Sequence, residues 1–115
     1  MRSADLLEAM LQKAILKRVT LKGESLISAS LEEADLTEAD LTGADLREAD
    51  LREATLESTC LTRANLRGAN LFMVEATGAQ MQHAQLQGCD LKGANLADAD
   101  LEGARLTGSN CRGRN

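Results

Sequence analysis

Few side chains in this sequence have the types and the spacing that catalysis requires. His83 is the only histidine, and no cysteine or carboxylate stands at the spacing of a zinc site from it. The serines have no base beside them, so the sequence shows no pairing of a nucleophile with a base. We therefore predict that the protein is not an enzyme and that it needs no metal and no cofactor.

The three cysteines indicate a compartment rather than a reaction. Cys60, Cys89 and Cys111 are an odd number at no metal-binding spacing, which is typical of a reducing environment. No apolar run is long enough to span a membrane, and Met1 and Arg2 are followed by alternating polar residues rather than by the apolar core of a signal peptide. We expect a cytoplasmic protein that does not bind a membrane.

Carboxylates are abundant, and they concentrate in one stretch, residues 32–57, which we call the acidic belt. It has ten acidic residues and two arginines, so its net charge is −8, against −5 for the whole chain. Solvated carboxylates without a cleft have no cause to shift their pKa, which argues against acid–base catalysis. The belt is either a contact surface for a partner or simply a solvated repeat surface. Its candidate contacts are Asp40, Asp45, Asp50 and Glu53.

These residues belong to a five-residue repeat that runs through the chain. The stretch from Ala34 to Leu51 reads ADLTEADLTGADLREADL. Of the 23 positions in the phase of the Leu, from Met1 to Cys111, 19 are Leu. We name the Leu the central position and the next two residues the first and second corner positions. The residue two before the Leu, usually Ala, is the small position. The residue just before the Leu, often Asp, is the outward position.

Glycine locates the corners of this repeat. All nine glycines occupy the second corner position, which indicates a turn that repeatedly needs positive φ. Between corners the chain is extended, so the small and central side chains share the inner face and the outward side chain points away. A period of five fits neither a helix nor a flat strand. If four corners close a coil, coils of about 20 residues stack and bury Leu over Leu.

The Ala-Asp-Leu-x-x run resembles the pentapeptide-repeat family, and the match extends from Ala4 to about Gly113. The resemblance implies an all-β fold, a right-handed quadrilateral β-helix with four repeats in each coil. Residues 1–115 would then form a single domain of between five and six coils. The implied function is a non-catalytic structural or protein-interaction module, a rigid rod that binds an unidentified protein partner and not nucleic acid.

The same resemblance offers an alternative function, a DNA-mimicking topoisomerase (gyrase) inhibitor of the quinolone-resistance type. Inhibitors of this type are longer, often dimeric and acidic along the rod. In this chain the acid forms a belt and both ends are basic, unlike phosphates spaced along a duplex. The interaction module is therefore the preferred prediction.

The phase of the repeat also predicts which candidate residues are exposed. Phe72, the only aromatic residue, is at a first corner position and should be exposed, which makes it a candidate partner contact. Alternatively, its ring could be covered by Arg52 and Lys92, which lie one coil away on either side. His83, at a second corner position, should be solvated.

The cysteines should differ in their environments. Cys60 is at an outward position, where its thiol could react. Cys89 and Cys111 are at a small and a central position, so they should point inward as substitutes for Ala and Leu.

Two structures are open for residues 1–18. The segment reads as an amphipathic helix that could cap the rod, and also as a first coil, because it keeps the five-residue phase. As a coil, it would expose Leu7, Met10 and Ile15. Glu24 occupies a small position, where an unpaired carboxylate is costly, so the coil could be distorted there.

The ends of such a rod favour association, because the terminal coils leave backbone hydrogen-bonding groups unpaired. Residues 1–18 can cap their own end if they are helical, whereas nothing in the last repeats up to Asn115 forms a cap. We therefore predict a weak end-to-end homodimer in which the C-terminal coil is favoured.

Overall fold

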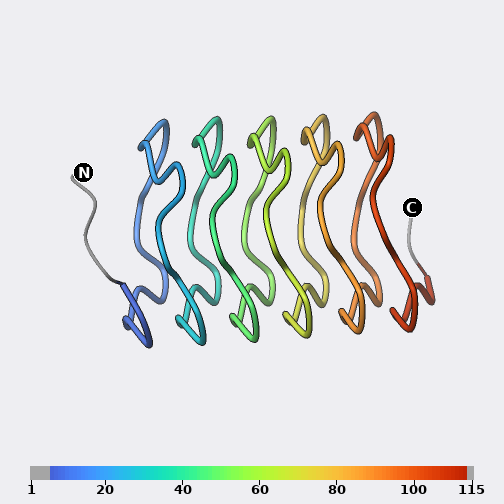
Figure 1. The fold of residues 1–115 in the computed structure, drawn as a ribbon. Helices are drawn as coiled ribbons and strands as arrows, with labels where there is room; N and C mark the ends of the chain where they lie inside the picture. Colours follow the sequence, from blue (N-terminus) through green and yellow to red (C-terminus); the bar gives the residue numbers. More distant parts are fainter. Residues whose placement is uncertain (1–5, 114–115) are drawn as a thin grey trace.

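The computed structural model describes residues 6–113 and shows a four-sided coil that repeats every 20 residues. Outward residues 20 positions apart form parallel β-bridges, from Met10 with Ser30 to Asp90 with Asn110. Since 20 residues are four repeats of five, each coil has four sides. The coils stack along one axis, with the two ends of the described chain at opposite ends of the rod (Figure 1). This arrangement is the quadrilateral β-helix that the family resemblance of the repeat implies.

Each side of the coil is very short. Every five-residue repeat from residue 6 to residue 110 contains one bridge residue and a two-residue turn, and residues 6–113 contain no extended strand and no helix. Within it there is accordingly no helix long and apolar enough to cross a membrane.

Backbone hydrogen bonds join each coil to the next at three positions of every repeat. The N–H of Leu46, at a central position, donates to the C=O of Asn65 at 2.7 Å, and the Glu48 N–H donates to the Arg67 C=O at 3.0 Å. In the other direction, the Asn65 N–H donates to the C=O of Ala44 at 2.9 Å. Because the same bonds recur along the rod, most backbone polar groups inside it are satisfied.

All 22 described second corner positions have positive φ, between 55° and 74°. The nine glycines behave as predicted, but thirteen other residues, among them Glu48, adopt the same conformation. A hydrogen bond closes each corner, such as that from the Ala49 N–H to the Leu46 C=O at 3.0 Å, and positive φ at the third residue is what a type II turn requires. The stacked coils therefore hold side-chain-bearing residues in a conformation that they rarely adopt alone.

The interior is a narrow column of Leu and Ala. The central and small positions from residue 21 to residue 96 are buried. Two polar groups in this column find backbone partners. The Thr59 hydroxyl donates to the Leu36 C=O at 2.7 Å, and the Cys89 thiol donates to the Leu66 C=O at 2.8 Å. The core therefore accepts a hydroxyl or a thiol in place of Ala.

Residues 6–18 form the first coil rather than a helix. The Leu11 N–H donates to the Ser30 C=O at 2.7 Å, the bond that a central residue makes elsewhere in the rod. The helical cap considered for residues 1–18 is therefore wrong for residues 6–18, because their backbone bonds go to the next coil. Residues 1–5 lie outside the described part of the chain.

Glu24 points inward, as predicted, but the coil around it is regular. The residue is 5% exposed, and its C=O accepts the usual bond from the Asp45 N–H at 2.9 Å. The distortion considered from the sequence is absent. The carboxylate has no hydrogen-bond or ion-pair partner among residues 6–113. Among residues 6–113, Gln87 Oε1 is the one fully buried side-chain oxygen that lacks a hydrogen bond. The carboxylate oxygens of Glu24 are therefore not fully buried and remain in contact with solvent.

Replacing Gly43 by Val should destabilise the protein by about 1 kcal/mol or more, because a β-branched residue is forced to positive φ. Gly43 has a φ of 67°, and a Cβ there would meet no atom within 4 Å, so the cost would come from the backbone alone. Gly43→Asn is the matched control and should lose clearly less, because Asn tolerates this conformation. Denaturant unfolding of the two variants tests the prediction, and equal stability would contradict it.

Candidate interaction surface

The acidic belt places one aspartate on each side of the rod. Asp35, Asp40, Asp45 and Asp50 are consecutive outward residues, so they occupy the four sides of one coil, and each bridges to a residue 20 positions along the chain. We name the four sides of the rod after these residues. The belt therefore surrounds the rod and does not form a single acidic face.

All four carboxylates accept hydrogen bonds from the corner that follows them, and for two of them the donor is a threonine. Asp35 Oδ1 accepts from the Thr37 hydroxyl at 2.6 Å and from the Thr37 N–H at 3.0 Å. Asp40 makes the same two bonds with Thr42. The hydroxyl bonds are the main cause that lowers the pKa of Asp35 and of Asp40. The expectation of ordinary pKa values is wrong here, because the corner supplies donors that the sequence reading did not consider.

The other two carboxylates bind arginines. Nε and Nη2 of Arg47 donate to the two oxygens of Asp45 at 2.9 and 2.7 Å. Arg52 binds Asp50 in the same way, at 2.8 and 2.6 Å. These charge-assisted bonds lower the pKa of Asp45 and of Asp50. Both carboxylates are therefore already engaged within the chain.

Asparagines at the outward position act in the same way. Asn70 Oδ1 accepts the Phe72 N–H at 3.0 Å, and Asn95 Oδ1 accepts the Ala97 N–H at 3.1 Å. A side-chain oxygen that accepts the N–H two residues later is typical of a turn that begins at Asp or Asn. The preference for Asp and Asn at this position therefore has a structural cause.

The structure brings together three of the five predicted contact residues. The Glu53 N–H donates to the Phe72 C=O at 2.9 Å, and Asp50 stands at the start of the same corner, three residues before Glu53. Asp40 and Asp45 lie on other sides of the rod. Phe72 is half-buried rather than exposed, so its ring offers less contact surface than the sequence predicts.

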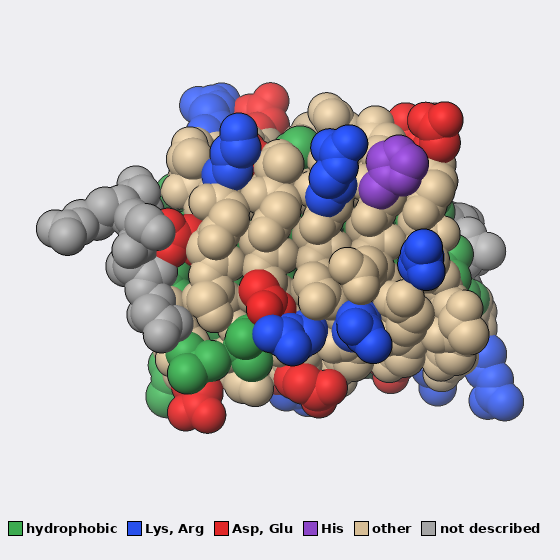
Figure 2. Space-filling model, in the orientation of Figure 1, with side chains coloured by type: hydrophobic (Ala, Val, Ile, Leu, Met, Phe, Trp, Pro, Cys, Tyr) green, Lys and Arg blue, Asp and Glu red, His purple; other side chains and the backbone are tan. Residues whose placement is uncertain are grey.

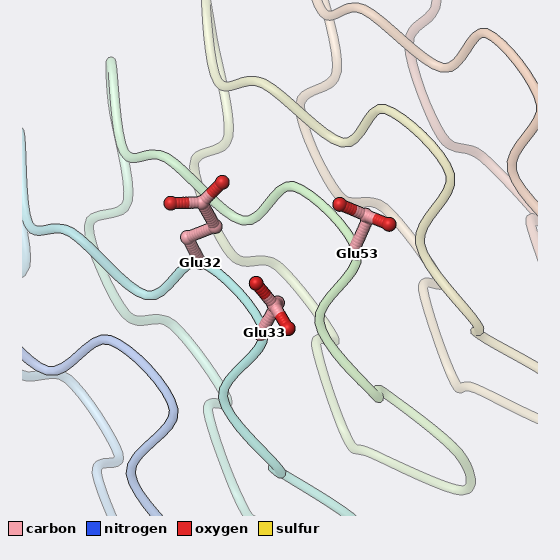
Figure 3. A group of neighbouring side chains, drawn as sticks. All are labelled: Glu32, Glu33 and Glu53. Carbon is pink, nitrogen blue, oxygen red and sulfur yellow. The ribbon is translucent and has the colours of Figure 1, made fainter.

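Three glutamates meet at the corner that follows Asp50. The carboxylates of Glu32, Glu33 and Glu53 lie within 4.8 Å of one another, and we call them the acidic corner. Figure 3 shows that Glu32 and Glu33 come from one coil and Glu53 from the next. Arg52 Nη2 lies 3.7 Å from Glu32 Oε2 and offsets part of the charge. Sequence reasoning missed this cluster, although a spacing of 20 residues, one coil, was the available signal.

The thiols of Cys60 and Cys89 have opposite environments. Burial raises the pKa of the Cys89 thiol to about 12. Partial burial also opposes ionisation of Cys60, but hydrogen bonds with Thr42 and Thr62 outweigh it, so the pKa of Cys60 is lowered. Cys60 is half-buried and Cys89 is buried, as their positions in the repeat predict.

Two cavities lie on the Asp45 side of the rod. The larger, of about 540 Å³, is lined by Arg63, His83, Gln85, Gly103 and Arg105. We call it the Arg63 cavity. His83 is exposed, as expected, but sequence reasoning did not place it beside arginines. In Figure 2 the histidine stands on a face where several Lys and Arg side chains gather.

The smaller cavity has a different lining. It has a volume of about 430 Å³, and Ile27, Arg47, Glu48 and Arg67 line it. Because Glu48 contributes a carboxylate and Arg47 is bound to Asp45, the positive charge of this cavity is largely compensated.

The first described coil exposes apolar side chains. Met10 and Ile15 are 75% and 78% exposed, and Leu7 is exposed as well. These are the three residues that the sequence predicts to project outward from a coil at this end. Met73, at the corner next to Phe72, is the other large apolar side chain that is exposed between residues 6 and 113, at 46%.

Comparison with known proteins identifies the repeat. The family model of pentapeptide repeats matches residues 29–68, 59–95 and 77–113. The crystal structure of alr5209, a pentapeptide repeat protein from Nostoc PCC 7120, is 39% identical over 67% of this chain and 64% of that chain, with a TM-score of 0.66. Among curated proteins, none matches this sequence.

Two further structures are more distant. Rfr23, a pentapeptide repeat protein from the cyanobacterium Cyanothece 51142, is 28% identical over 88% of this chain and 86% of that chain, with a TM-score of 0.45. QnrB1, a plasmid-mediated fluoroquinolone resistance protein, is 20% identical over 91% of this chain and 73% of that chain, with a TM-score of 0.39.

Iodoacetamide should modify Cys60 in the native protein well before Cys89. A lowered pKa increases the thiolate fraction of Cys60 near neutral pH, whereas the raised pKa and the burial of Cys89 suppress its reaction. Peptide mass mapping over time measures both rates. In guanidinium chloride the two rates should converge. Equal rates in the native protein would contradict the assignment of environments.

Proposed function

Because this chain belongs to the pentapeptide-repeat family, whose members are right-handed quadrilateral β-helices and generally non-enzymatic, we propose that it is a non-catalytic module that binds a protein partner. The observation that supports this best is the acidic corner beside Phe72 and Met73. There, acidic and apolar groups share one exposed surface, which is the composition of a contact patch for a partner that is both basic and apolar.

The proposed contact surface at the acidic corner includes fewer residues than the set of contacts predicted from the sequence. Glu53 and Phe72 belong to it, and Asp50 borders it. Asp40 and Asp45 are on other sides and are engaged by Thr42 and Arg47. We therefore assign Asp40 and Asp45 to the support of the fold.

The gyrase-inhibitor alternative has no specific observation in its favour. The acidic residues circle one coil, whereas a mimic of duplex DNA needs negative charge along the axis. A cytoplasmic location remains part of the proposal, because three cysteines without a disulfide suit a reducing compartment.

Removing the charge of the acidic corner should weaken capture of the partner. The variant Glu32→Gln, Glu33→Gln, Glu53→Gln loses three charges at half-buried or exposed positions, so it should fold. In pull-downs from the native host at low salt, we expect it to recover clearly less of the partner found with the parent protein.

A charge-matched variant controls for the total charge. Glu48→Gln, Glu57→Gln, Glu75→Gln also removes three carboxylates, all of them exposed and outside the acidic corner. It should recover as much partner as the parent. If both variants lose the partner equally, the contact depends on net charge and not on the corner.

Self-association is a second part of the proposal, and we now assign it to the N-terminal coil. The preference for the C-terminal coil depended on a helical cap over residues 1–18, whereas residues 6–18 form a coil that exposes Met10 and Ile15. Exposed apolar side chains grouped at one end favour association.

Ile15→Lys should therefore reduce self-association, whereas Cys111→Lys should not. Ile15 projects outward, so a lysine there adds charge to the surface without entering the core. Light scattering over a concentration series measures the apparent mass of the parent and of both variants. A parent protein that stays monomeric throughout, or a loss caused by Cys111→Lys alone, would overturn the assignment.

A further inference from the structure

We propose that the Arg63 cavity binds a phosphate group, with Arg63, His83, Gln85 and Arg105 as its ligands. This site shares no residue with the acidic corner proposed for a protein partner. The surface of the rod is hollowed where these four residues meet. A concavity of about 540 Å³ on such a surface has room for a phosphate group and part of the molecule that carries it.

The stacking of coils brings these residues together. Arg63, His83 and Gly103 occupy one corner in three successive coils, which are about 4.8 Å apart. Gln85 and Arg105 are bridge partners on the adjoining side. The lining therefore contains two guanidinium groups, an imidazole and an amide, and these offer several N–H donors to the three oxygens of a phosphate monoester.

Gly103 has a specific part in this arrangement. A Cβ at residue 103 would meet Nδ1, Cε1 and Cγ of His83, so the imidazole occupies the space that a side chain there would fill. The ring consequently lies against the backbone of the next coil rather than extending freely into solvent. Its position between Arg63 and Arg105 depends on the absence of that side chain.

The ligands of the proposed site are not engaged elsewhere. Arg18, Arg47 and Arg52 are bound to carboxylates. In contrast, the side chains of Arg63 and Arg105 make no hydrogen bond or ion pair within residues 6–113, and His83 and Gln85 likewise have no side-chain partner there. No carboxylate lines the cavity. In a chain of net charge −5, two unpaired arginines at one concavity are a local excess of positive charge suited to an anion.

Nearby acids limit the affinity but do not fill the site. The N–H of His83 donates to the C=O of Glu102 at 2.8 Å, so Glu102 is on the next coil at the same corner. Asp100, farther along that side, is engaged by Gln82 Nε2 at 3.0 Å. The cavity is open to solvent, so we expect binding to weaken with salt.

The test is a titration of the ¹⁵N-labelled protein with inorganic phosphate at low ionic strength, followed by NMR. Amide signals of residues 63, 83, 85, 103 and 105 should shift together and saturate. In Arg63→Gln, Arg105→Gln, binding should weaken about tenfold or more, because each lost hydrogen bond to a charged group has an effect of this order. Both arginines are exposed, so the variant should keep a folded spectrum.

A matched control removes two charges outside the cavity. Arg67→Gln, Lys92→Gln should bind phosphate like the parent, since both residues are exposed and neither lines the Arg63 cavity. Shifts spread over the whole surface, or equal weakening in both double variants, would overturn the proposal. No saturable shift at the five residues would overturn it as well.

Two further probes identify the source of the phosphate. A short phosphoserine peptide and its unphosphorylated form are titrated in the same way. Tighter binding of the phosphopeptide than of inorganic phosphate assigns the site to a phosphorylated side chain. Equal or weaker binding assigns it to a free phosphate compound. An unphosphorylated peptide that binds as tightly as the phosphopeptide would contradict recognition of phosphate.

Discussion

The backbone hydrogen bonds between successive coils are the interaction on which the rest of this structure depends. They recur at the central, second corner and outward positions of every repeat, each with a net value of about 1 kcal/mol. Their period of 20 residues sets which side chains become neighbours. The burial of Leu over Leu, the positive φ at the corners and the columns on the surface all follow from that one register, because a shift by one residue would turn the inner side chains outward.

The aspartates show how a repeat can be misread as a site. Asp at the outward position gives the belt its charge, but its oxygens accept hydrogen bonds from the corner that follows, as Asp40 does from Thr42. Asp45 and Asp50 are also paired with arginines two residues later. A carboxylate whose bonds are made within the chain has less to offer a partner, since those bonds would have to be exchanged or broken.

The two candidate binding surfaces, the acidic corner and the Arg63 cavity, are each formed by residues from different coils. The acidic corner joins Glu32 and Glu33 to Glu53, and the Arg63 cavity joins Arg63 to Arg105. They carry opposite charge and lie at different corners of the rod. A rigid rod keeps such surfaces at fixed positions relative to each other, so one protein could hold a basic partner and a phosphate-bearing ligand at the same time.

The sequence by itself determined the repeat, the inner faces of Leu and Ala, the glycine corners, and which side chains project outward if the first residues form a coil. All of these depend on phase within five residues. The tertiary structure decided that residues 6–18 are a coil, that Glu24 does not distort it, that Phe72 is half-buried, and which side chains meet across coils. The reason is that contacts across coils join residues about one coil apart and depend on side-chain direction, whereas local phase specifies neither the pairing of Arg52 with Glu32 nor the packing of His83 over Gly103.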